Sequence, residues 1–378
     1  MEPRRTRWIC LNLIPDVAPA HWRRCLEAFG DIDRLWEADA QTLQRAAGVS
    51  PRVAQRIVEG RRETGRLERE LALAARLGVR LVTRDDTEYP AVLRTIPDPP
   101  LALYVRGALG PADAAAVAMV GARHASAYGL ACADQLSYDV ALRGITVVSG
   151  LARGIDAAAH AGALKASGRT LAVLGSGLAR LYPPEHAALA ERIAQHGAVI
   201  SEYPLETPPL PEYFPRRNRL ISGLSLGVVV VEASQRSGAL ITVDCALEQG
   251  REVFAVPGPM TAVTSQGTHH LLKQGARLVT SVEDIVEELG LAALRQRSVA
   301  GQAGLSATPA LRATPDAPVA VSDRAQRVLA CLRKDDPVHI DAIAAASGCA
   351  MPDVSSILLE LELCEVIRQL PGKQFVRK

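Results

Sequence analysis

The strongest constraint on the fold is a regular alternation of short apolar runs and helical segments between about residues 114 and 290. Six runs are strand candidates, at 116–120, 145–149, 170–174, 197–201, 226–231 and 252–256. Runs that are apolar throughout, such as 227–231, are typical of strands covered on both faces. The pattern predicts an α/β fold with a Rossmann-like, doubly wound, mostly parallel sheet, whose ligands bind beyond the carboxyl ends of the strands.

The segment before this core predicts a module of short helices over residues 1–78. Gly30 and Gly48 fall where helices should end, and Ser50 followed by Pro51 is typical of a helix start. Short helices joined by Gly turns indicate a SAM-like or helix-hairpin-helix-like module. The turn amides of such modules can hold DNA phosphates, and a purely structural or protein-binding module is the alternative.

The core domain is predicted to span 79–290, and it begins with an extended stretch. Residues 79–107 are interpreted as extended because Pro90, Pro97, Pro99 and Pro100 break helices. Within this stretch, 101–105 is a strand candidate that leads into the core.

Two further regions follow the core. Residues 291–320 are rich in Ala, Ser, Pro, Gly and Gln, which predicts a flexible linker. Residues 321–378 then show three helical segments, at 324–333, 340–346 and 352–363, followed by a β-hairpin around 371–372. Three helices and a hairpin form the plan of a winged helix, a helix-turn-helix variant.

The loops after the first three core strands are built from small residues. They lie at 120–123, 149–156 and 175–177. Glycine permits tight turns and close backbone approach, and the following helix presents free amides to an anion. Three such loops at one sheet edge predict a phosphate site. Its candidate residues are Gly121, Arg123, Ser149, Gly150, Gly154, Gly175 and Gly177.

Aromatic residues are scarce, yet Tyr182, Tyr203, Tyr213 and Phe214 gather in the segments after the third and fourth core strands. Bases of an unpaired strand stack on aromatic rings, and guanidinium groups hold its phosphates. For Tyr182 and Tyr203, packing within the protein is the simpler interpretation. The candidate residues of the segment that begins at Phe214 are Phe214, Arg216, Arg217, Asn218 and Arg219.

Motifs of the usual chemistries of this fold class do not occur. No G-x-G-x-x-G follows the first core strand, and no P-loop is present. The one G-x-S-x-G pattern, at 223–227, runs into a strand candidate instead of following a strand, so it is not a nucleophile elbow. His269 and His270 are adjacent, a spacing that rarely serves one metal. We therefore expect no catalytic residue, no cofactor and no metal: a binding protein rather than an enzyme.

The overall charge carries no information about partners, because 43 basic residues face 41 acidic ones. No apolar run approaches the roughly 18 residues that a membrane helix needs, and the amino terminus lacks the features of a signal peptide. The seven cysteines form no C-x-x-C pair. These observations predict a cytoplasmic protein with reduced thiols.

Taken together, these residues resemble the DNA-processing protein A (DprA/Smf) family. FPxRNR followed by RSGxLIT is the most specific part of the resemblance. The matching segments are VGAR at 120–123, SGLARGID at 149–156, GSGL at 175–178, YPPEH at 182–186, SEYP at 201–204, FPRRNRLISGLSLGVVVVEA at 214–233, RSGALIT at 236–242, ALEQGREVFAVPGP at 246–259 and SQGTHHLLKQGA at 265–276.

The resemblance implies a homodimer that binds incoming single-stranded DNA during natural transformation, protects it and helps to load the RecA recombinase on it. Family phosphate contacts would fall on the three small-residue loops, and the stacking segment on 214–219. Ser237 and Thr242, within RSGALIT, complete the predicted DNA-binding set.

Three positions depart from the family pattern. Ala122 replaces a serine, Pro211 stands where many relatives have a lysine, and His269 replaces an asparagine common in the family. Arg216 or Arg217 is expected to supply the charge that is missing at Pro211.

Two alternatives remain. A LOG-like phosphoribohydrolase shares this core, but the segment 257–261 lacks that family's glycine-rich loop and catalytic Glu. A DNA-binding regulator would use the winged helix, but its recognition-helix candidate, 351–357, carries no Arg or Lys to read guanines.

Overall fold

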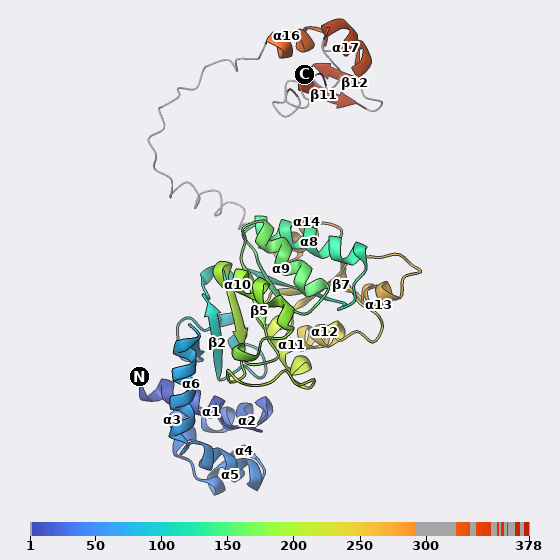
Figure 1. Cartoon of the computed structure of the whole chain (residues 1–378). Helices are drawn as coiled ribbons and strands as arrows, with labels where there is room; N and C mark the ends of the chain where they lie inside the picture. Colours follow the sequence, from blue (N-terminus) through green and yellow to red (C-terminus); the bar gives the residue numbers. More distant parts are fainter. Residues whose placement is uncertain are drawn as a thin grey trace. The chain divides into compact units, whose positions relative to one another are not determined.

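The computed structural model describes residues 2–291, 323–332, 338–348, 354, 357–358, 361, 367–370 and 374–377. The chain divides into two compact units, Met1–Leu305 and Ser306–Lys378 (Figure 1). Within the described residues, no helix is both long and apolar enough to cross a bilayer. The predicted linker at 291–320 lies outside the described residues from 292 onwards.

A nine-stranded sheet forms the centre of the first unit, in the order β1-β2-β6-β5-β4-β3-β7-β8-β9. β1 and β2 are antiparallel to their neighbours, and the strands from β6 to β9 in this order run parallel. The strands are β1 (Arg80–Thr83), β2 (Ala102–Gly107), β3 (Ala116–Gly121), β4 (Thr146–Ser149), β5 (Thr170–Val173), β6 (Ala198–Ser201), β7 (Gly227–Glu232), β8 (Glu252–Ala255) and β9 (Arg277–Leu278).

All six predicted core strands are confirmed, and each end lies within one residue of the predicted one. The reason is burial: every residue of β7 is buried, because helices cover both faces of the sheet. β3 is flanked by β4 on one side and β7 on the other. The chain therefore reverses its direction of winding at β3, which is the switch point where ligands of doubly wound sheets bind.

Two layers of helices enclose the sheet. On one face, α8, α9 and α14 pack against β3, β4 and β7, and α10 continues the layer over β5 and β6. On the other face, α7, α11, α12 and α13 cover the remaining apolar side chains. These helices are α7 (Ala91–Arg94), α8 (Ala127–Leu142), α9 (Ile155–Lys165), α10 (Ala187–His196), α11 (Tyr213–Gly223), α12 (Ala239–Glu248), α13 (Gln266–Lys273) and α14 (Val282–Glu288).

The region predicted to be extended departs from the prediction at one place. Residues 91–94 form the short helix α7, which starts directly after Pro90. Proline lacks an N–H, but the first N–H groups of a helix have no intrahelical partner, so Pro90 at the N-cap does not oppose the helix.

Six short helices precede the sheet. The first five share one apolar core around Trp8, Trp22 and Leu43, whereas α6 packs against Leu81 and Tyr104 of the sheet. Gly30 and Gly48 end α2 and α4 in the left-handed conformation, as predicted, with φ of 67° and 59°. Ser50 caps α5 by accepting from Val53 N, with Pro51 in the first turn. The helices are α1 (Pro3–Asn12), α2 (Pro19–Phe29), α3 (Ile32–Glu37), α4 (Ala40–Ala47), α5 (Pro51–Gly60) and α6 (Thr64–Arg76).

The second unit contains a small antiparallel sheet in the order β10-β12-β11. The predicted hairpin is confirmed, because β11 pairs with β12. Of the predicted helix at 352–363, only positions 354, 357, 358 and 361 are described, and all four side chains are buried. The elements are α16 (Asp323–Ala330), β10 (Val338–His339), α17 (Ile340–Ser347), β11 (Ile367–Leu370) and β12 (Gln374–Arg377).

A buried histidine on α9 makes the first unit sensitive to acid. His160 is fully buried, and its Nδ1 lies 2.7 Å from Thr170 Oγ1. Thr170 Oγ1 donates its own proton to Val147 O, so the histidine donates through Nδ1. Burial lowers the pKa of His160 to about 3, because a charged ring would lose its hydration.

We expect the stabilisation from neutral His160 to be complete above the unfolded-state pKa of about 6.5 and to fall as the pH drops towards 3. At about pH 5 the loss should reach about 2 kcal/mol. Urea unfolding of wild type and His160→Gln across this range measures it, and the variant should show the shallower decline. Equal declines in the two proteins would contradict this account.

Candidate nucleic-acid interface

Two arginines and two aromatic rings meet beyond the carboxyl ends of β3, β4 and β5. Arg123 follows β3, Arg153 lies in the loop after β4, Tyr182 follows β5, and Phe214 occupies the first turn of α11. The Arg123 guanidinium lies 5.5 Å from the centre of the Phe214 ring. Tyr182 packs edge-on against Phe214 with 5.7 Å between ring centres. We call these four residues the cationic–aromatic cluster.

The surface of this cluster is shallow. Arg123, Arg153, Tyr182 and Phe214 border a depression of only about 20 Å³. Arg123 and Arg153 are exposed, and Phe214 is half-buried. A site that encloses a small molecule is a concave pocket of about 300–1,000 Å³. The cluster instead offers a half-buried aromatic ring beside two exposed cations.

Arg217, which is buried, supports this surface from inside the protein. Its side chain is 4% exposed, and Nη1 donates to Gly150 O at 2.8 Å and to Val173 O. The guanidinium thereby joins the ends of β4 and β5. Its carbon also lies 6.0 Å from the Phe214 ring centre, on the buried side. The prediction that Arg217 contacts phosphate is therefore corrected: the side chain is buried and bonds within the protein.

The backbone amides of the loop after β4 already bind an anion of the protein itself, the Asp156 carboxylate. The Asp156 carboxylate accepts from Gly150 N at 3.1 Å and from Ala152 N at 3.3 Å. Leu151, between them, adopts a left-handed conformation with φ of 55°, which turns both amides towards one point. Burial raises the pKa of Asp156, and the attraction of Arg217 and the two amide donors oppose that shift. These amides are therefore not available to a DNA phosphate.

A second internal carboxylate occupies the start of α8. Glu232 is buried and accepts from Ser126 N at 2.8 Å and from Ser126 Oγ at 2.7 Å. The helix amides that were expected to face an anion after β3 are thus partly satisfied within the chain. The Arg123 side chain of this loop is exposed to solvent.

The predicted glycines serve the packing of the chain against itself. A Cβ on Gly121 would lie 2.6 Å from Ile155, one on Gly154 would lie 2.2 Å from Ala122 O, and one on Gly177 would lie 2.2 Å from Leu205 O. Gly150 and Gly175 make room for the site itself, since a Cβ there would meet Arg217 at 2.6 Å and Phe214 at 2.9 Å.

Three other predicted residues are buried. Arg219 is 7% exposed and forms ion pairs with Glu202 and, at 3.3 Å, with Asp98. Ser149 Oγ donates to Met119 O at 2.6 Å, and Thr242 is 2% exposed. The structure therefore corrects these three as well: they support the site from inside and do not reach its surface.

The remaining predicted residues lie at the surface or close to it. Arg216 is exposed, and Asn218 Nδ2 lies 3.4 Å from Gly238 O in the loop between β7 and α12. Ser237 Oγ, in the same loop, accepts from Ala239 N at 3.3 Å.

Two exposed cations were not in the predicted set. Arg153 pairs with Glu185 at 2.5 Å and lies 5.9 Å from the Tyr182 ring centre. Arg236 is exposed in the loop after β7, beside the switch point. Both lie in loops that directly follow core strands. Their position in such loops could have identified them from the sequence.

The fold and the cluster define a doubly wound α/β protein with a cationic–aromatic surface at its switch point. Two family models match the chain: DNA recombination-mediator protein A over residues 80–290, and the DprA winged helix domain over residues 312–373. The chain therefore belongs to the DNA recombination-mediator protein A family, and the resemblance and the winged-helix prediction are confirmed.

Individual relatives agree with the family models. Protein Smf of Escherichia coli is 42% identical over 365 residues, which are 94% of this chain and 90% of that protein. Protein Smf of a Synechocystis species is 32% identical and covers 98% of each chain.

Two solved structures share the architecture. That of DNA processing protein A from Streptococcus pneumoniae has a TM-score of 0.67 and 34% identity, and the match covers 76% of this chain and 99% of that one. A structure of the Helicobacter pylori protein, described as showing its single-stranded DNA binding mode, has a TM-score of 0.50 and 28% identity, covering 56% and 95%.

The buried charges predict a clear stability result. Arg217→Met leaves the Asp156 charge buried without its compensating cation, so we expect a loss of about 3–5 kcal/mol in the free energy of unfolding. In the double variant Arg217→Met/Asp156→Asn, the amide oxygen still accepts from the loop but carries no charge. Urea unfolding should show that the double variant recovers part of the loss. A double variant no more stable than Arg217→Met would show that the charge of Asp156 is not the cause.

Proposed function

We propose that this protein binds single-stranded DNA at the cationic–aromatic cluster, with a base on Phe214 and phosphates on the surrounding exposed arginines. The observation that carries the proposal is the exposed Arg123 guanidinium lying over the partly exposed Phe214 ring, at the switch point of the sheet. The single-stranded DNA binding described for the Helicobacter pylori protein supports it. Stacking tolerates any base, because every base has a π-face.

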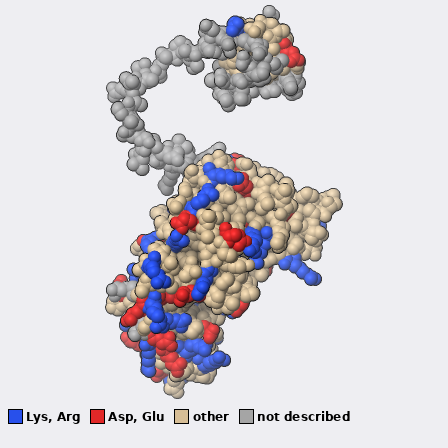
Figure 2. Space-filling view, in the orientation of Figure 1, with Lys and Arg blue, Asp and Glu red and all other residues tan. Residues whose placement is uncertain are grey.

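The charge distribution agrees with DNA binding by a few specific arginines instead of a large basic surface. On the face in Figure 2, basic and acidic side chains are interspersed, and most lie over the amino-terminal helical part. A protein with 43 basic and 41 acidic residues creates no strong overall field. Affinity should therefore depend on Arg123, Arg153, Arg216 and Arg236, the exposed arginines of the loops and helix start around the cluster.

The wider role that we propose follows the family resemblance. The protein would be a cytoplasmic homodimer that protects incoming DNA during natural transformation or recombination and helps to load RecA on it. It would perform no covalent chemistry and need no cofactor. The predicted organisation supports this role: a helical module at 1–78, a DNA-binding domain at 79–290, a linker at 291–320 and a winged-helix domain at 321–378.

We expect Phe214→Ala to weaken binding of a fluorescent oligo-dT by roughly ten- to a hundredfold, since stacking of one base contributes about 1–3 kcal/mol. Arg123→Ala should weaken it by roughly the same factor, since a hydrogen bond to a charged group contributes about 1.5–3 kcal/mol. Fluorescence anisotropy measures the affinity. Arg192→Ala is the matched control, because it removes the same charge from an exposed position on α10. Wild-type affinity in both site variants would refute the location of the site.

The salt dependence of the affinity distinguishes the phosphate contact of Arg123 from the base contact of Phe214. For single strands, the slope of log K against log salt changes by about 0.7 per neutralised phosphate. Arg123→Ala should make the slope shallower by about that amount, whereas Phe214→Ala should lower the affinity and leave the slope unchanged. If both variants changed the slope equally, the division into phosphate and base contacts would be wrong.

A further inference from the structure

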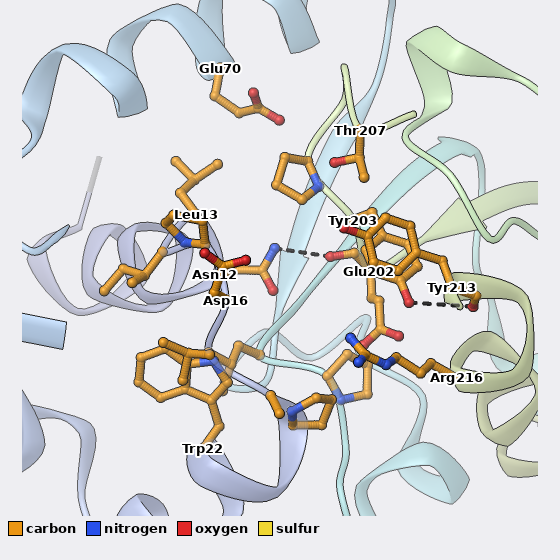
Figure 3. A pocket seen from close by; sticks show the side chains of 18 of the residues that line it. Asn12, Leu13, Asp16, Trp22, Glu70, Glu202, Tyr203, Thr207, Tyr213 and Arg216 are labelled. Carbon is orange, nitrogen blue, oxygen red and sulfur yellow. Dashed lines mark hydrogen bonds between the residues drawn. The ribbon is translucent and has the colours of Figure 1, made fainter. Parts of the chain in front are cut away.

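A large cavity lies beside the cationic–aromatic cluster, beyond the carboxyl end of β6. Its volume is about 790 Å³, and its walls come from two parts of the chain that are far apart in sequence. Asn12 and Trp22 belong to the amino-terminal helices, and Tyr203, Tyr213 and Arg216 belong to the sheet-containing part and face them across the cavity (Figure 3). α6 contributes a further wall with Arg66, Arg69 and Glu70.

The two walls are held together by specific contacts. Asn12 Nδ2 donates to Glu202 O at 3.1 Å, and Leu205 N donates to the Glu70 carboxylate at 2.7 Å. Both bonds reach the segment that follows β6. The cavity is therefore pre-formed, and the amino-terminal helices have a defined position relative to the edge of the sheet where the cluster lies.

The cavity continues the aromatic surface of the cluster. Tyr213 and Phe214 are consecutive residues in the first turn of α11, and consecutive helix positions point about 100° apart. Phe214 packs against Tyr182, whereas Tyr213 stacks on Tyr203 with 4.5 Å between ring centres. A strand that stacks a base on Phe214 and runs along the sheet edge towards β6 therefore meets the tyrosine pair at the cavity next.

Four of the described residues that line the cavity are arginines, and one of them, Arg219, pairs with Glu202. Arg66, Arg69 and Arg216 line it and form no salt bridge among the described residues. By contrast, three of the acidic residues there are occupied. They are Asp16, paired with Arg56, Glu202, paired with Arg219, and Glu70, which accepts from Leu205 N.

Two acidic residues, Glu206 and Glu212, also line the cavity and have no ion-pair partner in the described part of the chain. Glu70 bonds to a backbone N–H and has no ion-pair partner in the described part of the chain either, so three unpaired cations face three unpaired carboxylates. The local balance is close to neutral, so this site can extend a bound strand but is a poor independent site for DNA.

We propose that the cavity binds the nucleotides that flank the segment held at Phe214, with phosphates on Arg66, Arg69 and Arg216 and bases beside the Tyr203–Tyr213 pair. This inference rests on the proposed function and makes the amino-terminal helical module part of the DNA-binding surface. Binding in the cavity requires a strand long enough to reach it, whereas binding at the cluster does not.

The test uses the full chain, the variant Arg66→Ala/Arg69→Ala and a series of oligo-dT from about 4 to about 16 nucleotides, the range of site sizes of other single-strand-binding folds. The control is Arg62→Ala/Arg76→Ala, which removes the same charge from exposed positions at the two ends of α6, outside the cavity. Circular dichroism and thermal unfolding check that each variant is folded.

The cavity variant should bind the shortest oligonucleotides that wild type binds equally well, and it should bind the longest roughly tenfold more weakly, with a salt slope shallower by about 1.4. The control should match wild type at every length. Unchanged affinity of the cavity variant at all lengths would overturn the inference and leave the cavity to another partner, such as a peptide. The variant Arg123→Ala tests the proposed function separately, because it should weaken binding at every length.

Discussion

The backbone of Gly150 connects two opposite charges that the protein buries at the carboxyl edge of its sheet. Its N–H donates to Asp156, and its carbonyl accepts from Arg217, which also bonds to Val173 O. Burial lowers the pKa of Arg217 to about 10, which still leaves the guanidinium charged at neutral pH. Because each buried charge would be unfavourable without the other, the loop after β4, the end of β5 and the start of α11 keep one arrangement.

This arrangement determines what the surface can bind. Phe214 is fixed between Tyr182 and the Arg217 guanidinium, and the absence of a side chain at Gly175 gives it room. The carboxylates of Asp156 and Glu232 satisfy amides that a phosphate could otherwise have used. The exposed face that we propose for a single strand therefore consists of arginine side chains and an aromatic ring, and the backbone mainly shapes that face.

The sequence was sufficient to predict the strands and several helix ends, because burial on both faces and capping glycines leave local patterns. It was not sufficient to sort the arginines at 216, 217 and 219. In a helix, neighbouring positions face different surroundings. The partners that bury Arg217 and Arg219 come from Gly150, Val173 and Asp98, all distant in sequence. The sequence also did not show that the Asp156 carboxylate occupies the loop after β4. The glycines of this loop fit an open phosphate site equally well.

A structure of the full chain with a short oligo-dT would test the central claim most directly. The account predicts a thymine base against the Phe214 ring and a neighbouring phosphate on the Arg123 guanidinium, with Arg217 still bonded to Gly150 and Val173. A strand bound at another surface, with Arg123 and Phe214 both free of DNA, would contradict it.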